Sequence, residues 1–233
     1  MRSTVTRILL ALGLLAGIAS FSGALAQDAS YGAGQDGANH ASHSDHASSA
    51  GAITPQQIEL QQAMRALWDD HVTWTRLFIV EFAADSPATD ATAQRLLQNQ
   101  VAIGDAIKPF YGDDAGTALT ALLTDHILGA VDLLTAAKSG DTGAVDEASA
   151  RWYANGDDIA AFLSAANPEA WPLDVMRATM KGHLDHTVAE AVAHLNGDWP
   201  ADIAAYNAAR SHILDMADVL SAGIISQFPE SFS

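Results

Sequence analysis

The chain of 233 residues contains no cysteine, and this absence removes two kinds of site. No disulfide framework can form, and no metal ion can be held by thiolates, so any metal ligand must be His, Asp, Glu, Met, Asn or backbone. Basic residues are also scarce, since 11 Lys and Arg stand against 28 Asp and Glu, for a net charge of -17. This balance argues against nucleic acid and anionic membrane surfaces as partners. It is compatible with cation binding, or simply with a solvated acidic surface.

Motifs that identify a reaction are missing as well. The glycines form neither a dinucleotide-binding fingerprint nor a phosphate-binding loop, and no nucleophile motif or Ser-His-Asp order is present. The chain also has no hairpin signal and no alternating run rich in β-formers. These absences favour an all-helical protein and indicate no particular enzyme class.

The first 26 residues have the pattern of a secretory signal peptide, with an uncleaved anchor as the alternative. Arg2 and Arg7 flank the start of an apolar run over residues 8–18, and residues 24–26 (Ala-Leu-Ala) form a cleavage site. The apolar run is too short for a transmembrane helix, and no later stretch approaches ~18 uninterrupted apolar residues. We therefore expect a periplasmic or secreted protein with no transmembrane anchor after cleavage.

Residues 27–53 are rich in Gly, Ala, Ser, Asp and His and predict a disordered linker. Within it His40, His43 and His46 recur every three residues. Flexible imidazoles collect Cu(II), Ni(II) or Zn(II), because affinity there depends on ligand type more than on preformed geometry. The three histidines are either a weak metal collector or an incidental part of a low-complexity segment.

From residue 54 to residue 233 the pattern predicts one all-α bundle domain. Thr54, Pro55 and Gln57 form a helix start with a capping box. Apolar residues then recur with a period near 3.6, between stops rich in Pro, Gly and Asn. The expected helices cover roughly residues 54–84, 89–110, 115–138, 142–166, 172–195 and 200–225. In the last of them, Ile203 and Val219 are expected on the buried face.

A polar residue returns at nearly constant spacing on the buried faces of these helices. The six positions, separated by 28, 27, 29, 28 and 29 residues, are His71, Asn99, His126, Asn155, His183 and His212. This spacing predicts that the helices pair into three αα-hairpin repeats of about 56 residues, stacked around one core. The alternative is a superhelical array of hairpins, which would spread the six residues along its length.

Three interpretations of these polar positions are open, because an unpaired buried imidazole costs roughly 1–3 kcal/mol. The first is a hydrogen-bonded layer that fixes helix register in a structural or partner-binding bundle. The second is the binding or sequestration of a transition metal, Cu, Zn or Ni, without catalysis. The third is an enzyme, a hydrolase or a transferase, in which His and Asp act as acid and base in a pocket.

For the metal interpretation, the candidate ligands in the bundle are His126, His183, His212 and Asp215, with His71 as a further member. His212 and Asp215 are three residues apart, which places both on one helix face. The chain has no Glu-x-x-His pair, so a carboxylate-bridged di-iron site is not indicated. The expected site is therefore rich in nitrogen ligands, with the linker histidines as a separate collector.

Several stretches resemble a family of bacterial helical proteins. They are residues 67–76 (LWDDHVTWTR), 95–100 (RLLQNQ), 108–112 (KPFYG), 151–155 (RWYAN) and 224–229 (IISQFP). The resemblance spans most of residues 67–228. Members of this family are labelled "glycosyltransferase" or carried as uncharacterised proteins. The resemblance therefore implies a helical fold and a transferase label, and it brings no catalytic residues.

Overall fold

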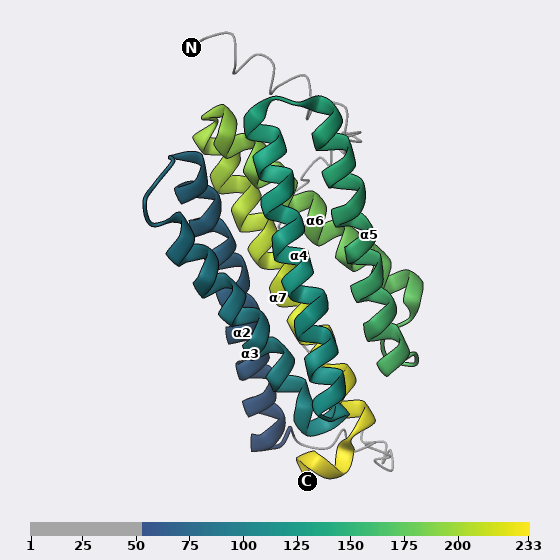
Figure 1. Ribbon diagram of the computed structural model, residues 1–233. Helices are drawn as coiled ribbons and strands as arrows, with labels where there is room; N and C mark the ends of the chain where they lie inside the picture. The colour runs from purple at the N-terminus through teal and green to yellow at the C-terminus, as the bar shows by residue number, and fades with distance from the viewer. Residues whose placement is uncertain (1–52) are drawn as a thin grey trace, which may run out of the picture.

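The computed structural model describes residues 53–233, which form six long α-helices and a short 3₁₀ helix (Figure 1). In chain order these are α2 (Pro55–Ala83), α3 (Thr89–Tyr111), α4 (Asp113–Ser139), α5 (Thr142–Ala166), α6 (Leu173–Asn196), α7 (Trp199–Gln227) and η1 (Pro229–Phe232). No strand occurs in this part of the chain, so the prediction of an all-α bundle is confirmed. The predicted signal peptide and the histidines at positions 40, 43 and 46 lie outside the described residues.

The helix ends follow local capping chemistry. At the start of α2, the Gln57 N–H donates to Thr54 Oγ1 (3.2 Å) and the Thr54 N–H donates to Gln57 Oε1 (3.1 Å), so the predicted capping box is present. Asp141 and Asp198 accept backbone N–H bonds at the starts of α5 and α7. Helix α4 ends at Gly140 in the left-handed conformation. These caps keep the connections short, so consecutive helices run antiparallel.

The six helices form a closed ring. Each helix packs against its neighbours in the chain, α7 returns to pack against α2, and α2 also touches α6. Because the direction alternates, α2, α4 and α6 run the same way (Figure 1). Residues at the middle of these three helices therefore lie at one level of the bundle. The described helices are not spread into a superhelical array.

Helices α3 and α4 approach each other closely where a glycine on one faces a glycine on the other. A Cβ atom on Gly104 would lie 2.5 Å from the carbonyl oxygen of Gly116, and one on Gly116 would lie 2.6 Å from the carbonyl oxygen of Gly104. No side chain fits at this crossing, so both positions require glycine. The contact fixes the two helices that carry Asn99 and His126.

The predicted buried face of α7 is wrong by one residue at two positions. Ile203 and Val219 are 56% and 44% exposed, whereas Asp202 and Leu220 are 2% and 3% exposed. Adjacent residues on a helix point about 100° apart, so two neighbouring positions can both border an apolar stripe. Asp202 takes the buried position because its carboxylate bonds to Arg76 on α2 and to His194 on α6.

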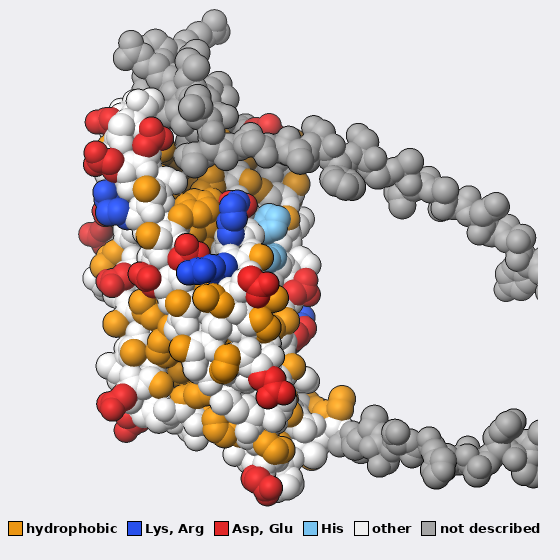
Figure 2. Space-filling model, turned by 90° about the vertical axis from the view of Figure 1, so that its right-hand side faces the viewer, with side chains coloured by type: hydrophobic (Ala, Val, Ile, Leu, Met, Phe, Trp, Pro, Cys, Tyr) orange, Lys and Arg blue, Asp and Glu red, His pale blue; other side chains and the backbone are white. Residues whose placement is uncertain are grey.

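The surface carries its charges unevenly. Figure 2 shows acidic side chains spread over the height of one face, while Lys, Arg and His gather in its upper half. Among the described helices, α4 alone is long and apolar enough to cross a membrane by length and composition. In the ring α4 packs between α3 and α5 and carries Asp125, His126 and Asp132.

Candidate functional site

Three histidines meet in the middle of the bundle. His71 on α2, His126 on α4 and His183 on α6 are 2%, 3% and 3% exposed. The ring centroid of His183 lies 5.5 Å from that of His71 and 5.8 Å from that of His126. The structure thus brings together three of the residues singled out in the sequence, one from every second helix of the ring. We call these three residues the central histidines.

The polar residues on the other three helices donate hydrogen bonds to the backbone of the preceding helix at this level, and we call these bonds tethers. Asn99 Nδ2 donates to the Leu67 carbonyl (2.9 Å), Asn155 Nδ2 to the Leu122 carbonyl (3.1 Å) and His212 Nε2 to the Thr179 carbonyl (2.9 Å). Each accepting residue lies one helical turn before a central histidine. The same bond therefore joins α3 to α2, α5 to α4 and α7 to α6 at the same level.

The amide groups around two of the rings determine which ring nitrogen carries the proton. Because the Asn155 amide nitrogen donates to α4, its Oδ1 faces His126 Nδ1 at 2.9 Å and accepts a hydrogen bond from it. At His71 the arrangement is reversed, since Nδ1 faces the amide nitrogen of Gln100 at 3.3 Å, and a ring nitrogen that faces a donor carries no hydrogen. The two hydrogens of Gln100 Nε2 are shared among His71 Nδ1, the Leu96 carbonyl (2.9 Å) and Asn99 Oδ1 (3.2 Å). The two neutral rings therefore hold different tautomers.

His183 lacks an equivalent partner. Its Nδ1 is buried and has no hydrogen-bond partner among the described residues. In the α6–α7 pair, His212 occupies the position that Asn99 and Asn155 occupy in the other two pairs. An imidazole that donates from Nε2 has no amide oxygen that could accept a hydrogen bond from His183. An unpaired buried polar atom costs about 1–3 kcal/mol. The α6–α7 pair therefore leaves one ring nitrogen of the polar layer unsatisfied, and the α2–α3 pair leaves Gln100 Oε1 buried without a partner.

Burial keeps the central histidines neutral. Desolvation lowers the pKa of His71 to about 3, with a further contribution from the neighbouring His126, and it lowers the pKa of His126 to about 4. Desolvation, together with the surrounding histidines, holds the pKa of His183 well below its usual value. Burial removes the three rings from solvent, so the charged form of each ring is disfavoured. At neutral pH the three rings offer lone pairs and no positive charge.

The other predicted ligands lie away from the central histidines. His212 is half-buried beside His186, with ring centroids 5.3 Å apart, and Asp215 is exposed on α7. Within residues 53–233, no three His, Asp or Glu side chains are placed so that they could hold a metal ion together. A metal ion shared by the central histidines would require at least one ring to turn.

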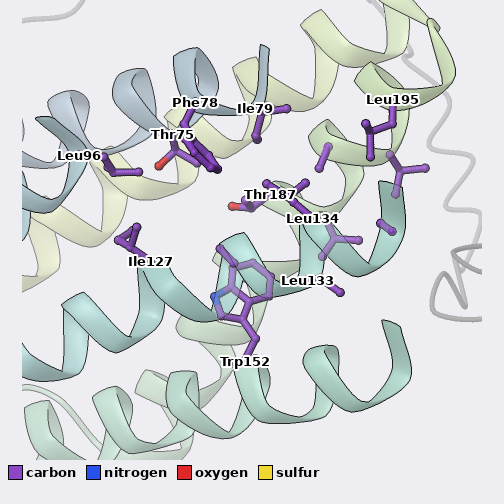
Figure 3. Close-up of a pocket in the computed structure, with 15 residues that line it drawn as sticks. Thr75, Phe78, Ile79, Leu96, Ile127, Leu133, Leu134, Trp152, Thr187 and Leu195 are labelled. Atoms are coloured by element: carbon purple, nitrogen blue, oxygen red, sulfur yellow. The ribbon is translucent and has the colours of Figure 1, made fainter. Parts of the chain in front are cut away.

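Two small apolar cavities flank the central histidines. The larger, about 40 Å³, is lined by residues that follow them along the helices, including Ile79 and Ile127 (Figure 3). The smaller, about 20 Å³, is lined by residues that precede them, including Met64. The two polar side chains at the larger cavity, Thr75 and Thr187, donate to carbonyls of their own helices. A buried water needs two to four polar partners, so these cavities suit apolar atoms.

A buried charged cluster lies between α2, α6 and α7. Arg76 donates to Glu190 (2.8 Å) and, through both Nη atoms, to Asp202 (2.8 and 2.9 Å), and His194 Nδ1 lies 3.1 Å from Asp202. Both carboxylates are 2% exposed. Burial raises the pKa of Glu190 to about 7, while hydrogen bonds from Arg76 hold the pKa of Asp202 below its usual value. One guanidinium thus serves two carboxylates.

The sequence pattern did not predict this cluster. Glu190 continues the buried face of α6 three residues after Thr187. This spacing was the one signal in the sequence that Glu190 is buried. Charged residues are rarely buried unless a partner of opposite charge is at hand. The partner here is on a helix more than a hundred residues earlier in the chain, so the spacing alone could not be interpreted.

A surface groove of about 260 Å³ runs between α5 and α6. Its lining includes Tyr153, Asp157, Arg177 and Lys181, and it contains no histidine. Its cations already have carboxylate neighbours, because Lys181 pairs with Asp185 at 2.6 Å and Arg177 lies 3.7 Å from Asp157. The central histidines, whose pKa values are shifted, are enclosed. They do not form the open acid–base cleft that the enzyme interpretation expects.

Comparison with protein-family models, with curated proteins and with solved structures finds no match to this chain. The family resemblance and the transferase label that it implies stay predictions. Function must therefore be inferred from the geometry of the polar layer and its surroundings.

Proposed function

We propose that the protein is an exported bundle of three αα-hairpin repeats, and that its buried His–Asn layer is an architectural element that specifies how the helices fit together. The observation that carries this proposal is the recurrence of one hydrogen bond, made by Asn99, Asn155 and His212 to the preceding helix. A layer that served only to bind a ligand or to catalyse a reaction would not need this hydrogen bond between neighbouring helices at three places. The signal-peptide pattern of residues 1–26 supports a role in the periplasm or outside the cell.

Such a layer acts on helix register because its bonds tolerate little displacement. Sliding one helix by a turn along its partner would withdraw each donor from its carbonyl and leave both groups buried and unpaired. Each unpaired group costs about 1–3 kcal/mol. Apolar side chains impose a weaker constraint, because cores accept extensive hydrophobic repacking before they lose stability. Buried polar residues fix register in coiled coils for the same reason.

The double variant Asn99→Leu/Asn155→Leu tests this role, since it replaces two tethers by apolar side chains of similar size. We expect the far-UV circular dichroism of the helices to persist, while the near-UV signal weakens and amide NMR resonances broaden or double. Gln98→Leu, at an exposed position of α3, is the matched control and should keep the parent spectra. A double variant with a single sharp set of resonances and the parent near-UV spectrum would contradict the proposal.

A second candidate function, binding of a transition metal by the central histidines, is supported by a different observation. The Nδ1 atom of His183 is buried and unpaired, and the rings of His71 and His126 beside it are neutral. An ion that drew the three rings together would satisfy the unpaired nitrogen. Cu, Zn and Ni are the metals that imidazole ligands suit.

Metal analysis separates the two candidates. The full chain carrying His40→Ala/His43→Ala/His46→Ala removes the linker histidines, and its metal content and melting temperature are measured with added Zn(II) and with chelator. About one retained equivalent that raises the melting temperature, and that is lost in His183→Ala, would favour the metal function. If the protein keeps no metal and shows no shift, the architectural role alone stands.

A further inference from the structure

We propose that His186 on α6 and His212 on α7 form a two-imidazole site for a divalent transition metal ion, Cu(II), Ni(II) or Zn(II), on the flank of the bundle. The two rings lie on adjacent helices with centroids 5.3 Å apart and planes inclined by 59°. Both side chains are half-buried, so the pair is open to solvent on one side. The site is separate from the central histidines and goes beyond the architectural role of the layer.

The protonation of His212 suits it for metal binding. Its Nε2 lies 2.9 Å from the Thr179 carbonyl oxygen, which can only accept, so Nε2 carries the hydrogen. In the neutral ring the lone pair is then on Nδ1. Metal-binding histidines in proteins commonly donate their other ring N–H to a backbone carbonyl or carboxylate, which fixes the tautomer and orients the ring. The Thr179 carbonyl supplies this support without any metal present.

A glycine gives the His212 ring its place against α6. A Cβ atom on Gly182 would lie 3.0 Å from His212 Cε1 and 3.3 Å from Nε2. A Cβ atom at this position would crowd the ring, which would have to move by a few tenths of an ångström away from the α6 backbone. Glycine therefore lets the ring dock on α6 next to His186, one turn further along the helix.

The residue type at position 212 is the strongest argument for a ligand. Asn99 and Asn155 make the same tether with an amide, so the tether itself does not require an imidazole. Asn155 also accepts a hydrogen bond from His126, whereas His212 leaves His183 Nδ1 without a partner. Histidine is thus the poorer choice for the layer. What histidine adds at position 212 is a second ring nitrogen, next to His186 on the adjacent helix.

The geometry and the charge of the site suit a divalent cation. Imidazole nitrogens bind such ions at about 2.0–2.1 Å, so two rings on one ion have centroids roughly 4.5–5.3 Å apart for angles between 90° and 115°. The observed separation lies at the upper end of this range. Asp215 is exposed three residues after His212, and the net charge of -17 attracts cations. Water completes the coordination.

The test uses the full chain with His40→Ala/His43→Ala/His46→Ala as parent, titrated with Cu(II) in a calorimeter and examined by electron paramagnetic resonance. The informative variant is His212→Asn, because asparagine can keep the tether to Thr179 while the imidazole is removed. We expect Cu(II) affinity to fall at least tenfold and the two-nitrogen hyperfine pattern to be lost. The melting temperature without metal should stay the same or rise, since an amide oxygen becomes available to His183.

Two further variants complete the design. His186→Ala should lose Cu(II) to the same extent as His212→Asn. His194→Gln, which changes another histidine of α6, should bind as the parent does. A parent that binds no Cu(II), or a His212→Asn variant with the parent affinity, overturns the proposal. Loss of binding in His183→Ala but not in His212→Asn also overturns it, because the ion would then lie among the central histidines.

Discussion

Acidification is expected to unfold the bundle through the central histidines. In the unfolded chain each imidazole binds a proton near the ordinary pKa of 6.5, whereas in the fold the pKa of His71 is about 3 and that of His126 about 4. Between these values the unfolded state holds more protons than the folded state. The stability linked to these groups is therefore fully present above pH 6.5 and is lost as the pH falls below it.

The loss at pH 4.5 is large compared with the stability of a typical domain. One pKa unit corresponds to about 1.4 kcal/mol, and pH 4.5 is about two units below the unfolded pKa and still above both folded values, so each ring contributes about 2.7 kcal/mol. Burial and the neighbouring histidines also hold the pKa of His183 well below its usual value, which adds to the loss in the same direction. His71 and His126 together account for about 5 kcal/mol, which is comparable with the roughly 5–15 kcal/mol that stabilises most domains. We therefore expect the free energy of unfolding to fall between about pH 6 and pH 4.5, although the raised pKa of Glu190 offsets part of this loss.

Urea titrations followed by circular dichroism, from pH 8 down to pH 4, measure this effect. The variant His183→Leu removes one titrating group together with the unpaired nitrogen. It should be at least as stable as the parent at pH 8, and its free energy of unfolding should fall less than that of the parent between pH 8 and pH 4.5. The reasoning is refuted if His183→Leu and the parent lose the same free energy of unfolding between pH 7 and pH 4.5, because both keep Glu190 and differ only in the buried imidazole.

Three further predictions concern the charged cluster, a tether and a cavity. Because the folded pKa of Glu190 is raised to about 7, its stability contribution is present below pH 4.5 and is lost as the pH rises to 7. Glu190→Gln should therefore be roughly 1–3 kcal/mol more stable than the parent in urea titrations at pH 8 and equal to it at pH 4.5; a destabilised variant at pH 8 would contradict this. Asp202→Asn is its matched opposite, and should lose stability at pH 8, because the folded pKa of Asp202 is lowered. Asn155→Ala leaves the His126 N–H without an acceptor and should lower stability by about 2–4 kcal/mol in thermal melts, whereas a loss below about 1 kcal/mol would show that the tether is weak. Ala191→Val places two methyl groups at the larger cavity and should add about 1 kcal/mol, unless its melting temperature falls because the cavity cannot accept them.

The fold class could be predicted from the sequence because its signals are local. The 3.6-residue period, the capping box at Thr54 and the stop at Gly140 each depend on a few neighbouring residues. The closure of the ring could not be predicted in the same way. It depends on contacts such as that between Arg210 Nε and Asp69 Oδ1, which lie 141 residues apart. No pattern among neighbouring residues indicates which side of α7 packs against α2.

The candidate site could be predicted only in part, for a related reason. A buried-stripe pattern treats His126, His183 and His212 alike, because each falls where an apolar residue is expected. The closed ring of six helices places these three residues in different surroundings. It brings the mid-helix residues of α2, α4 and α6 together, while the α7 residue donates to the backbone of the preceding helix. His212 and Asp215 were therefore predicted beside the central histidines, and they lie on the flank.

The buried charged cluster shows how ring closure creates acid–base behaviour that no single helix has. Glu190 on α6 and Asp202 on α7 share the one guanidinium of Arg76 on α2, so an ionised cluster carries an excess negative charge in the core. Protonation of Glu190 removes this excess, which is why its pKa rises while that of Asp202 falls. The central histidines lose stability below pH 6.5, and Glu190 loses it as the pH rises to 7. The most stable pH must therefore lie near neutrality, where the two opposing proton linkages meet.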